Sequence, residues 1–342
     1  MKLSDFDYYL PRSAIAQFPL KDRDASRMMV IKKEERSISH HLFKEIDEFL
    51  SPGDVCVVNN SRVIPARLWG TKESGGRVEI LLLTKRGQER HAVVWDALIR
   101  PARRVKVGTI LRFDDKGVAQ IRERIDGKKW RVAFSSEMPF EEFLEKYGAV
   151  PLPPYIKRKD TAEDRERYQT IFASTPGSVA APTAGFHFSP YILGKITARG
   201  VKVVEVTLHV GYGTFLPIET EEIEKHRMEE EWYLVSEEAA KTINAAKRVI
   251  AIGTTSARVL ETVADEEGRV HAGSGMTDLF IYPGYRFKRV NAMLTNFHLP
   301  RSSLLLMAAA FIGQDLLLTA YRLAVEQGYR FYSYGDCTFL LP

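Results

Sequence analysis

Histidine, threonine and aspartate side chains gather in five short segments of the second half of the chain, and four of these segments contain glycine. The segments are 178–188, 207–215, 252–258, 294–303 and 333–337. Glycine lets the backbone approach a ligand closely, and histidine titrates near neutral pH. Each segment also has an ordinary structural explanation, because Gly-X-Gly turns, capping threonines and buried histidines are common in scaffolds. Taken together, the five segments predict a ligand cleft.

Two further patterns indicate what such a cleft would bind. Thr254, Thr255 and Ser256 follow an apolar run and begin a helical pattern. Backbone N–H groups and the helix dipole at such a start favour an anionic or acceptor ligand group. Nearer the N-terminus, residues 59–67 offer asparagine, serine and arginine donors for a polyanion or a base edge. A polar loop between two domains explains 59–67 equally well.

Alternating strand and helix patterns surround these segments. We expect strands over 55–58, 201–208, 249–252, 279–282 and 293–294, and helices over 39–50, 237–248, 256–263 and 303–327. Ser236 is a plausible N-cap, and Gly313 is expected to break the last helix. This alternation favours a layered α/β core with some parallel pairing. Ligands of open α/β sheets bind outside the carboxyl ends of the strands, where at least three of the five segments would lie.

The region from about residue 68 to 134 has a different character. Five short β-type runs, at 77–83, 91–99, 109–113, 118–124 and 130–134, are separated by turns such as Asp126-Gly127. This pattern predicts a small antiparallel barrel or sandwich. Because the α/β pattern resumes afterwards, we interpret residues 68–150 as a barrel-like domain inserted into a discontinuous α/β catalytic domain of residues 1–67 and 151–342.

The positive charge of the chain is concentrated in this insertion. Residues 68–150 contain 17 Lys and Arg against 12 Asp and Glu, and this surplus of five equals the net charge of the whole chain, +5. Polyanion binding and ordinary surface charge explain the surplus equally well.

Several classes of function are excluded by the motifs. The sequence has no Gly-x-x-x-x-Gly-Lys-Ser/Thr loop, no Gly-x-Ser-x-Gly elbow and no His-Glu-x-x-His pair. No histidine has metal-ligand spacing, so we expect no metal and no nicotinamide cofactor. Cys56 and Cys337 are interpreted as reduced thiols. With no signal peptide and no apolar run near the roughly 20 residues that span a bilayer, we expect a cytoplasmic protein without membrane contact.

The chain resembles the S-adenosylmethionine:tRNA ribosyltransferase-isomerase family of queuosine biosynthesis along nearly its whole length. Each motif is moderately specific, but their number and order make the resemblance specific. The motifs lie at 6–11, 15–17, 23–27, 60–67, 153–155, 167–170, 181–185, 209–215, 253–255, 282–285, 295–300 and 333–336.

The resemblance implies a reaction and its substrates. The ribosyl moiety of S-adenosylmethionine would be transferred to the 7-aminomethyl-7-deazaguanine wobble base of tRNA and isomerised, giving epoxyqueuosine-tRNA, adenine and methionine. S-adenosylmethionine is then a substrate, and no cofactor is expected. A base would remove a C5′ hydrogen next to the sulfonium, an acid would protonate the departing adenine, and the attacking amine must be neutral.

The resemblance also assigns roles to residues of the motifs. Histidine suits proton transfers near neutral pH, and a carboxylate can orient it or meet the sulfonium. The catalytic candidates are His187, His209, His298 and Asp336. The substrate-binding candidates are Asn60, Arg62, Arg67, Thr183, Gly185, Gly211, Gly213, Thr214, Thr254, Thr255, Arg258 and Asn296.

The same resemblance implies that the basic insertion binds tRNA, because lysine and arginine make the contacts with its phosphates. The candidates are Arg103, Arg104, Lys128, Lys129 and Arg131. Tyr155, Tyr168 and Tyr285 are candidates to stack on a splayed anticodon base, although burial in the core explains each of them as well. We expect a monomer.

One position departs from the family pattern. The family usually has His-x-Met-His-x-Glu where this chain reads His226-Arg227-Met228-Glu229-Glu230-Glu231. Glu229 therefore cannot serve as an indispensable imidazole. Cys337 stands where alanine is common, which fits packing.

Two other classes of function remain open at this point. A non-catalytic tRNA-binding module would explain the basic insertion but not the histidine-bearing turns. A small-molecule nucleoside or sugar transferase would explain the turns but not the asymmetry of charge. Release of adenine that depends on tRNA bearing the aminomethyl base distinguishes all three.

Overall fold

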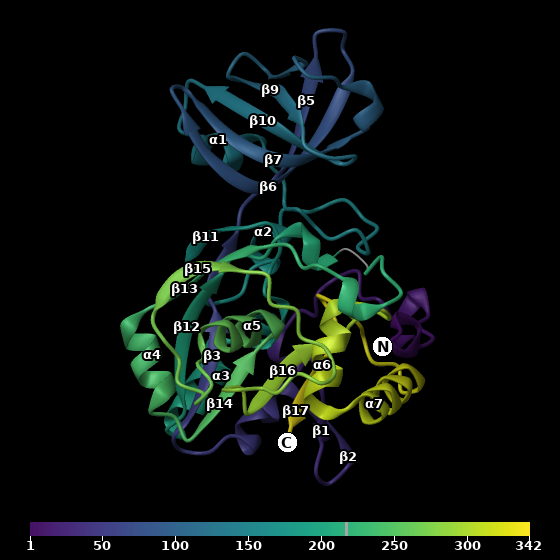
Figure 1. Cartoon of the computed structure of the whole chain (residues 1–342), viewed down its shortest axis with the longest axis vertical. Coiled ribbons are helices and arrows are strands. Elements are labelled where there is room, and N and C mark those ends of the chain that lie inside the picture. Colours follow the sequence, from purple (N-terminus) through teal and green to yellow (C-terminus); the bar gives the residue numbers. More distant parts are fainter. Residues whose placement is uncertain (216–217) are drawn as a thin grey trace.

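The computed structural model describes residues 1–215 and 218–342, and the side chains of Thr214 and Phe215 are outside this description. The chain forms an α/β domain with a closed antiparallel barrel set on one end of it (Figure 1). The predicted fold class, a layered α/β core with an inserted small antiparallel barrel, is confirmed.

A nine-stranded mixed sheet is the centre of the α/β domain. Its strands in spatial order are β15 (Gly273–Thr277), β13 (Glu231–Val235), β12 (Lys202–Leu208), β3 (Asp54–Asn59), β14 (Arg248–Ile252), β16 (Ala292–Asn296), β17 (Cys337–Leu341), β1 (Arg27–Lys32) and β2 (Ser37–Leu42). The four strands β12, β3, β14 and β16 are parallel to one another, and β17 runs antiparallel to β16. The carboxyl ends of these four strands and the amino end of β17 therefore meet at one edge.

Helices cover both faces of this sheet. Along β3, Val55 and Val57 pack on one face, while Cys56 and Val58 pack on the other, as the period of two in a strand requires. The first face carries α4 (Glu237–Asn244), α5 (Thr254–Val263), α6 (Ser303–Ile312) and α7 (Gln314–Glu326). The second carries α3 (Pro190–Ala198) and the 3₁₀ helix η4 (Phe43–Phe49). Strands buried on both faces read as continuous apolar runs, as 55–58 does.

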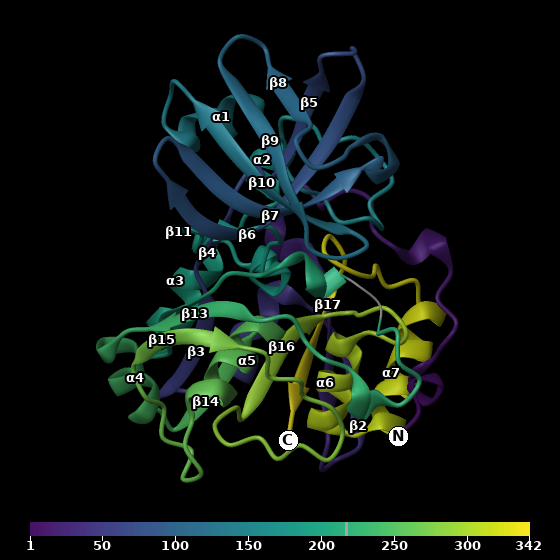
Figure 2. The same cartoon turned by 45° about the horizontal axis from the view of Figure 1, so that its top comes forward.

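The barrel closes in the order β10-β7-β6-β5-β8-β9. Its strands are β5 (Arg67–Lys72), β6 (Arg77–Glu89), β7 (Ala92–Arg100), β8 (Ile110–Phe113), β9 (Gly117–Arg124) and β10 (Lys129–Ser136). Five of these strands were predicted, and β5 is the sixth that closes the barrel. Helix α1 (Phe140–Tyr147) contributes Phe140, Phe143 and Leu144 to the barrel core. Figure 2 shows the barrel standing over the end of the sheet near β4 and β11.

The remaining elements are short. They are η1 (Leu3–Phe6), η2 (Arg12–Ala14), η3 (Arg23–Ala25), β4 (Ser61–Val63), η5 (Ala102–Arg104), α2 (Asp164–Arg167), β11 (Thr175–Ser178), η6 (Thr183–His187), η7 (Tyr212–Phe215) and η8 (Ile223–Lys225). Among them, only β4, α2 and β11 lie near the places where the chain passes between the two bodies. Strand β4 follows β3 directly and pairs in parallel with β11, so the chain leaves and re-enters the α/β domain at one place.

Several local predictions are confirmed and two are wrong. Ser236 caps α4 by accepting from Ala239 N, and Gly313, at φ 94°, separates α6 from α7. The helix expected over 39–50 is wrong, because the first residues form β2, paired antiparallel with β1, and only a 3₁₀ helix follows. The i, i+4 spacing of Leu42 and Ile46 was misleading there. The strand expected over 279–282 is also wrong, since that segment has no regular structure.

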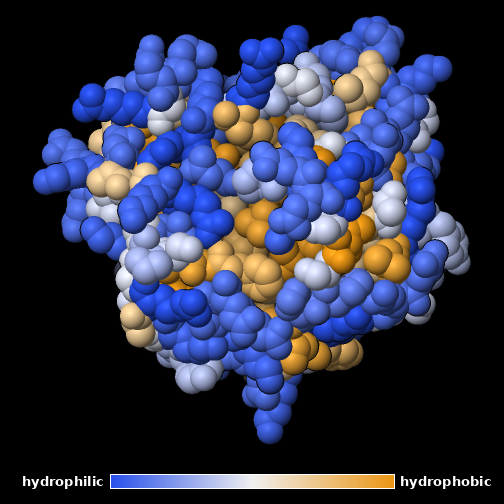
Figure 3. All heavy atoms as spheres, turned by 90° about the horizontal axis from the view of Figure 1, so that it is seen from below, coloured by the Kyte–Doolittle hydropathy of each residue, from blue (hydrophilic) through white to orange (hydrophobic). Residues whose placement is uncertain are grey.

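The end of the α/β domain remote from the barrel is mostly hydrophilic, with hydrophobic side chains gathered near its middle (Figure 3). Among the helices that the structure describes, none alone is long and apolar enough to cross a membrane. Only α6 and α7 together pass by length and composition, and they are bent by 117° at their junction.

Candidate active site

A cavity with an empty volume of about 540 Å³ lies where the carboxyl ends of the parallel strands meet. The lining residues come from all five predicted segments, from the adjacent Leu304 and Tyr332, and from Tyr155. They are Tyr155, Ala180–Ala184, Val210, Gly253–Thr255, Thr295–His298, Leu304, Tyr332 and Ser333. Within the described residues, no lysine, arginine, aspartate or glutamate lines the cavity.

The first turn of α5 forms one wall of the cavity. Gly253 lies at φ 95°, a conformation that favours glycine, and it has no side chain with which to cap the helix. Thr254 and Thr255 follow, and both are buried. Thr255 Oγ1 makes no hydrogen bond to any described part of the chain, although it is fully enclosed. A buried hydroxyl without a partner is unfavourable by about 1–3 kcal/mol, so this atom is suited to a ligand oxygen.

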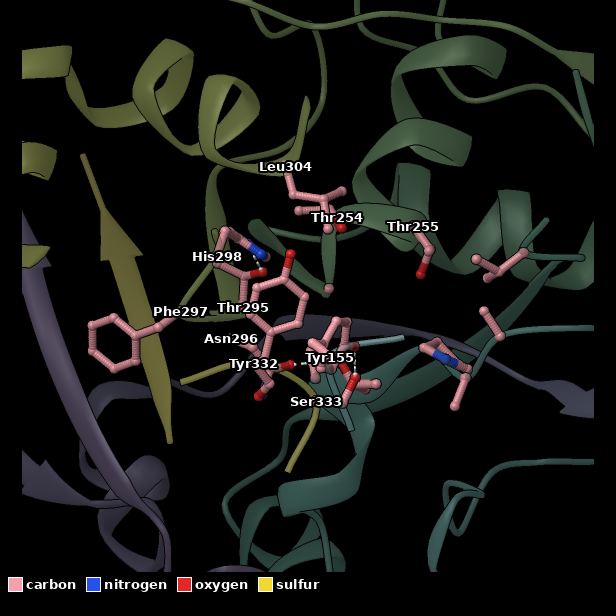
Figure 4. A pocket seen from close by; sticks show the side chains of 17 residues that line it. Tyr155, Thr254, Thr255, Thr295, Asn296, Phe297, His298, Leu304, Tyr332 and Ser333 are labelled. Carbon is pink, nitrogen blue, oxygen red and sulfur yellow. Dashed lines mark hydrogen bonds between the residues drawn. The ribbon is translucent and has the colours of Figure 1, made fainter. Parts of the chain in front are cut away.

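Two tyrosines form the opposite wall, as Figure 4 shows. The ring centroids of Tyr155 and Tyr332 are 3.9 Å apart with an interplanar angle of 59°, and Tyr155 Oη lies 2.5 Å from Ser333 Oγ. Tyr332 has φ 72°, which is rare for a residue with a side chain. Backbone hydrogen bonds from Tyr332 N to Phe297 O (3.1 Å) and from Gly335 N to Tyr332 O (2.8 Å) hold it there. Such strain at a cavity wall is typical of a positioned ligand contact.

His298 lies in the cavity, as predicted for a catalytic candidate. Its Nε2 is 2.8 Å from Thr295 Oγ1, its backbone N donates to Tyr321 Oη at 3.2 Å, and its carbonyl accepts from the Tyr8 hydroxyl. Burial lowers the pKa of His298 to about 3, because the charged form loses its hydration. The imidazole is therefore neutral at physiological pH.

His187 lies immediately behind the cavity wall and is connected to it by Asn296. Asn296 Nδ2 is within 3.4 Å of two carbonyl oxygens, of Tyr332 and Asp336, so the amide nitrogen must face them. The same nitrogen donates to His187 Nε2 at 3.2 Å, and Asn296 Oδ1 accepts from Thr183 Oγ1 at 2.8 Å. His187 Nδ1 then carries the proton, which points at Ser26 Oγ 2.7 Å away.

Burial lowers the pKa of His187 to about 3, and the charges of Arg23 and Arg330 act in the same direction. His187 is therefore a neutral, fully hydrogen-bonded residue that lines a neighbouring pocket and touches the cavity only through Asn296. Thr183 and Asn296, predicted as substrate-binding residues, do line the cavity.

His209 is outside the cavity. Its ring stacks on Trp232 with centroids 4.9 Å apart, and Nδ1 lies 2.8 Å from Ser61 Oγ. A Cβ on Gly177 would lie 2.4 Å from His209 Nε2, so the backbone of β11 closes over the ring. Burial lowers the pKa of His209.

Asp336 is also outside the cavity. Its two carboxylate oxygens accept backbone N–H groups of Arg27 (2.9 Å) and Arg330 (2.8 Å). Burial raises its pKa. The geometry is that of a carboxylate joining the start of β1 to the turn before β17.

Arg258, predicted to bind substrate, points away from the cavity. It forms a buried ion pair with Glu231 and donates to Leu279 O at 3.2 Å. Glu231 Oε1 in turn accepts from Gly211 N at 2.7 Å. The predicted Gly211 is thus held by this pair, next to the cavity-lining Val210.

The three predicted residues near the N-terminus are not in the cavity either. Asn60 is bonded to Glu205 and Thr207, Arg62 is exposed, and Arg67 spans the entry to the barrel through Glu79 and Leu152 O. They lie where the chain crosses between the domains, which is the alternative explanation that the sequence left open.

None of the predicted glycines Gly185, Gly211 and Gly213 lines the cavity. Gly185 is buried, and a Cβ there would lie 2.8 Å from Thr170 Cγ2. Gly213 faces a different hollow, of about 1160 Å³, between the barrel and the α/β domain. The side chain of Thr214, also predicted to bind substrate, is outside the described part of the structure.

The five basic residues predicted to contact tRNA do not form one patch. Arg103 and Arg104 are exposed near the outer end of β5, where Lys72 Nζ donates to Arg104 O. Lys128 and Lys129 lie at the opposite end of the barrel, facing Glu219 and Glu229 of the α/β domain. Arg131 is paired with Asp96 (3.1 Å) and Glu123 (2.8 Å).

Glu229, the departure from the family pattern, thus forms an ion pair with Lys129 across the two domains. Cys337 is a buried, free cysteine in the core beneath the sheet.

Sequence reasoning missed part of the cavity wall. Tyr332, Ser333, Thr295 and Leu304 were not predicted, and Tyr155 was considered only for stacking on RNA. Ser333 and Thr295 belong to segments that were singled out, so taking every hydroxyl in those segments would have found them. No sequence pattern around Tyr332 or Leu304 indicated that these residues would line the cavity. Of the other tyrosines considered, Tyr168 is fully buried, and Tyr285 donates to Glu261 at 3.1 Å.

Comparison with known proteins identifies the family. A family model described as queuosine biosynthesis protein matches residues 3–340. The S-adenosylmethionine:tRNA ribosyltransferase-isomerases of Syntrophus aciditrophicus and Moorella thermoacetica are 52% and 48% identical, and each alignment covers 100% of both chains. The crystal structure of the S-adenosylmethionine tRNA ribosyltransferase of Thermotoga maritima is similar, with 35% identity, a TM-score of 0.55, and coverage of 98% of this chain and 100% of that one. The chain therefore belongs to the queuosine biosynthesis protein family.

Proposed function

We propose that this protein is an S-adenosylmethionine:tRNA ribosyltransferase-isomerase. It transfers the ribosyl moiety of S-adenosylmethionine to the 7-aminomethyl-7-deazaguanine wobble base of tRNA and isomerises it to the epoxycyclopentanediol of epoxyqueuosine. Adenine and methionine are released. Family membership over the whole chain supports this activity. The structural observation that supports it best is a neutral cavity with aromatic and hydroxyl walls at the start of α5.

The walls of the cavity suit the parts of S-adenosylmethionine. The sulfonium is a cation without hydrogen-bond donors, and the faces of Tyr155 and Tyr332 attract such a group by about 0.5–2 kcal/mol. The methionyl carboxylate is an acceptor, and the first turn of α5 presents N–H groups together with the unpaired hydroxyl of Thr255. The ribose hydroxyls match the polar side chains of Thr183 and Asn296.

His298 is the histidine that we assign to proton transfer, because it is the one among the three candidates that lines the cavity. A neutral imidazole does not repel the sulfonium, whereas an imidazolium would. In this role His298 accepts the C5′ proton, the resulting ylide opens the ribose ring, and the proton is available to the departing adenine. His187 positions Asn296 and does not contact the substrate.

The tRNA substrate approaches from the side of the barrel in this proposal. The five basic barrel residues make separate phosphate contacts, with Arg103 and Arg104 at the outer end. Breaking the Lys128–Glu219 and Lys129–Glu229 pairs would free two more cations for RNA. We expect no cofactor beyond the substrates, a monomer, and a cytoplasmic location.

Adenine release tests the function directly. The protein is incubated with S-adenosylmethionine and with tRNA that carries either the aminomethyl base or guanine at the wobble position. We expect free adenine only with the aminomethyl base. Binding of both tRNAs without adenine release would instead indicate a binding module, and release without any tRNA would indicate a small-molecule transferase.

A further inference from the structure

A second pocket, with an empty volume of about 310 Å³, lies on the other side of Ser333 from the cavity. Arg23, Arg167 and His187 line it, together with the backbone of Gly335. Ser333 lines both hollows, and His187 is bonded to the cavity-lining Asn296. A group bound in this pocket is therefore one side chain away from a substrate in the cavity.

Two guanidinium groups, of Arg23 and Arg167, line this pocket, and a third, of Arg330, lies behind it close enough to act on His187. We call the three the arginine cluster. Arg167 donates to Leu20 O (2.7 Å) and Lys21 O (2.8 Å), and Arg330 donates to Phe18 O on the same segment. Arg23 makes only long contacts of 3.4 Å, to Phe186 O and Glu166 O. All of these acceptors are neutral carbonyls.

No member of the cluster forms an ion pair within the described part of the protein, although the charge of Glu166 acts on Arg23 from a distance. In the described part of the chain, no carboxylate oxygen lies within 4.0 Å of any of the three guanidinium groups. Asp336 attracts Arg330, but both of its oxygens already accept backbone N–H groups. Arg167 Nε and Arg330 Nη1 are enclosed and have no hydrogen-bond partner among the described atoms. Three like charges gathered in this way favour an anion between them.

An exposed aromatic ring, that of Phe18, precedes the pocket-lining Pro19 in the chain. Phe18 is 58% exposed, and the guanidinium of Arg158, which is paired with Asp164, covers one face of its ring at 4.3 Å from the centroid, so the other face is the one open to a base. Arginine beside an exposed ring is the combination with which proteins hold a splayed nucleotide, by phosphate contact and by stacking.

We propose that the arginine cluster binds a backbone phosphate of the RNA substrate, next to the nucleotide whose base enters the cavity. This inference rests on the proposed function. The phosphate lies between Arg23 and Arg167, and the adjacent base stacks on Phe18. The methionyl carboxylate has its own place at the start of α5, so the cluster serves the RNA and not S-adenosylmethionine.

The salt dependence of tRNA binding tests this proposal. Arg23→Gln removes one charge and only long hydrogen bonds, so the fold should tolerate it. Loss of one phosphate contact should weaken tRNA binding by roughly three- to tenfold near 0.15 M salt and reduce the slope of log K against log salt by about one. Arg322→Gln, an equal loss of charge at an exposed site on α7, should change neither quantity. The KM for S-adenosylmethionine should not change in either variant.

Two results would overturn the proposal. One is the same salt slope in native protein, Arg23→Gln and Arg322→Gln. The other is a higher KM for S-adenosylmethionine with unchanged tRNA binding, which would assign the cluster to the methionyl carboxylate. If thermal melting shows that Arg23→Gln is unfolded, Arg23→Met is used in its place. It keeps the aliphatic part of the side chain near Phe186. A native protein that binds tRNA but releases no adenine would contradict the proposed function and leave the phosphate site standing.

Discussion

Asn296 Nδ2 donates to His187 Nε2 at 3.2 Å, so the buried imidazole and the cavity wall form one hydrogen-bonded unit. The unit extends to Thr183, whose hydroxyl donates to the other end of the same amide. His187 therefore acts on the cavity through Asn296, and a change in either residue should be felt by the other.

This coupling can be measured in unfolding free energies. Asn296→Ala should reduce the free energy of unfolding by about 1–3 kcal/mol, because His187 and Thr183 lose a buried partner. Asn296→Ala and Thr183→Val should be non-additive by about 0.5 kcal/mol or more in urea denaturation. Asn244→Ala combined with Thr183→Val is the control pair and should be additive, since Asn244 is bonded to Val270 elsewhere. Additivity of the first pair would contradict the network.

Replacing the unpaired hydroxyl of Thr255 should change substrate binding without lowering stability. Thr255→Val removes a buried hydroxyl that has no partner in the described protein, so the variant should be at least as stable as the native chain. Its KM for S-adenosylmethionine should rise by roughly tenfold, because the carboxylate loses a charged hydrogen bond. Thr262→Val on the same helix is the matched control. It breaks the 2.7 Å bond to Thr277 and should lower stability without affecting KM. If Thr255→Val were less stable and had the native KM, the hydroxyl would contribute to folding and not to substrate binding.

The charge of the sulfonium gives a test of the tyrosine wall. Tyr332→Leu should weaken binding of S-adenosylmethionine by roughly 3- to 30-fold, because the cation loses an aromatic face. Binding of S-adenosylhomocysteine, a neutral thioether, should fall much less. Calorimetry with both ligands measures the difference, and Tyr191→Leu at an exposed position should behave as the native protein. An equal loss for both ligands would mean that the ring provides shape alone.

Stability should depend on pH through the two buried histidines. His187 and His298 have pKa values of about 3 in the folded chain, against an ordinary value near 6.5. The unfolded chain therefore binds more protons, and the free energy of unfolding should fall as pH decreases from about 6.5 towards 3. Each histidine contributes up to about 1.4 kcal/mol per pH unit in that range. His298→Gln should make the decline shallower in urea titrations between pH 7 and 4. An unchanged slope would contradict the buried, neutral state of His298.

Much of the fold followed from local patterns in the sequence. The apolar run at 55–58, the capped helix after Ser236 and the hairpin at Asp126-Gly127 each specify their structure locally. The segment 39–50 did not, because the pairing of Ser37–Leu42 with Arg27–Lys32 depends on residues outside it. Strand β5 was missed for the same reason, since only closure of the barrel makes Arg67–Lys72 a strand.

The site could be predicted only in part. Polar residues at strand ends were found because the edge of a parallel sheet brings such ends together, and Thr183, Thr254, Thr255, Asn296 and His298 do line one cavity. The direction of a side chain could not be predicted. Arg258 follows Thr255 on α5 by less than one turn, yet its guanidinium pairs with Glu231 and does not line the cavity. Tyr332 lines the cavity because its backbone has a positive φ, and no sequence pattern predicted that conformation.

The assignment of chemistry to the cavity is tested most directly by single-turnover adenine release in His298→Gln. Both substrates are supplied at saturation, and binding of S-adenosylmethionine is checked separately. We predict a rate that is lower by roughly 100-fold or more, as expected for loss of a general base. His271→Gln, at an exposed histidine paired with Asp265, should keep the native rate. A near-native rate of adenine release in His298→Gln would contradict the central claim that the cavity histidine carries out the proton transfer.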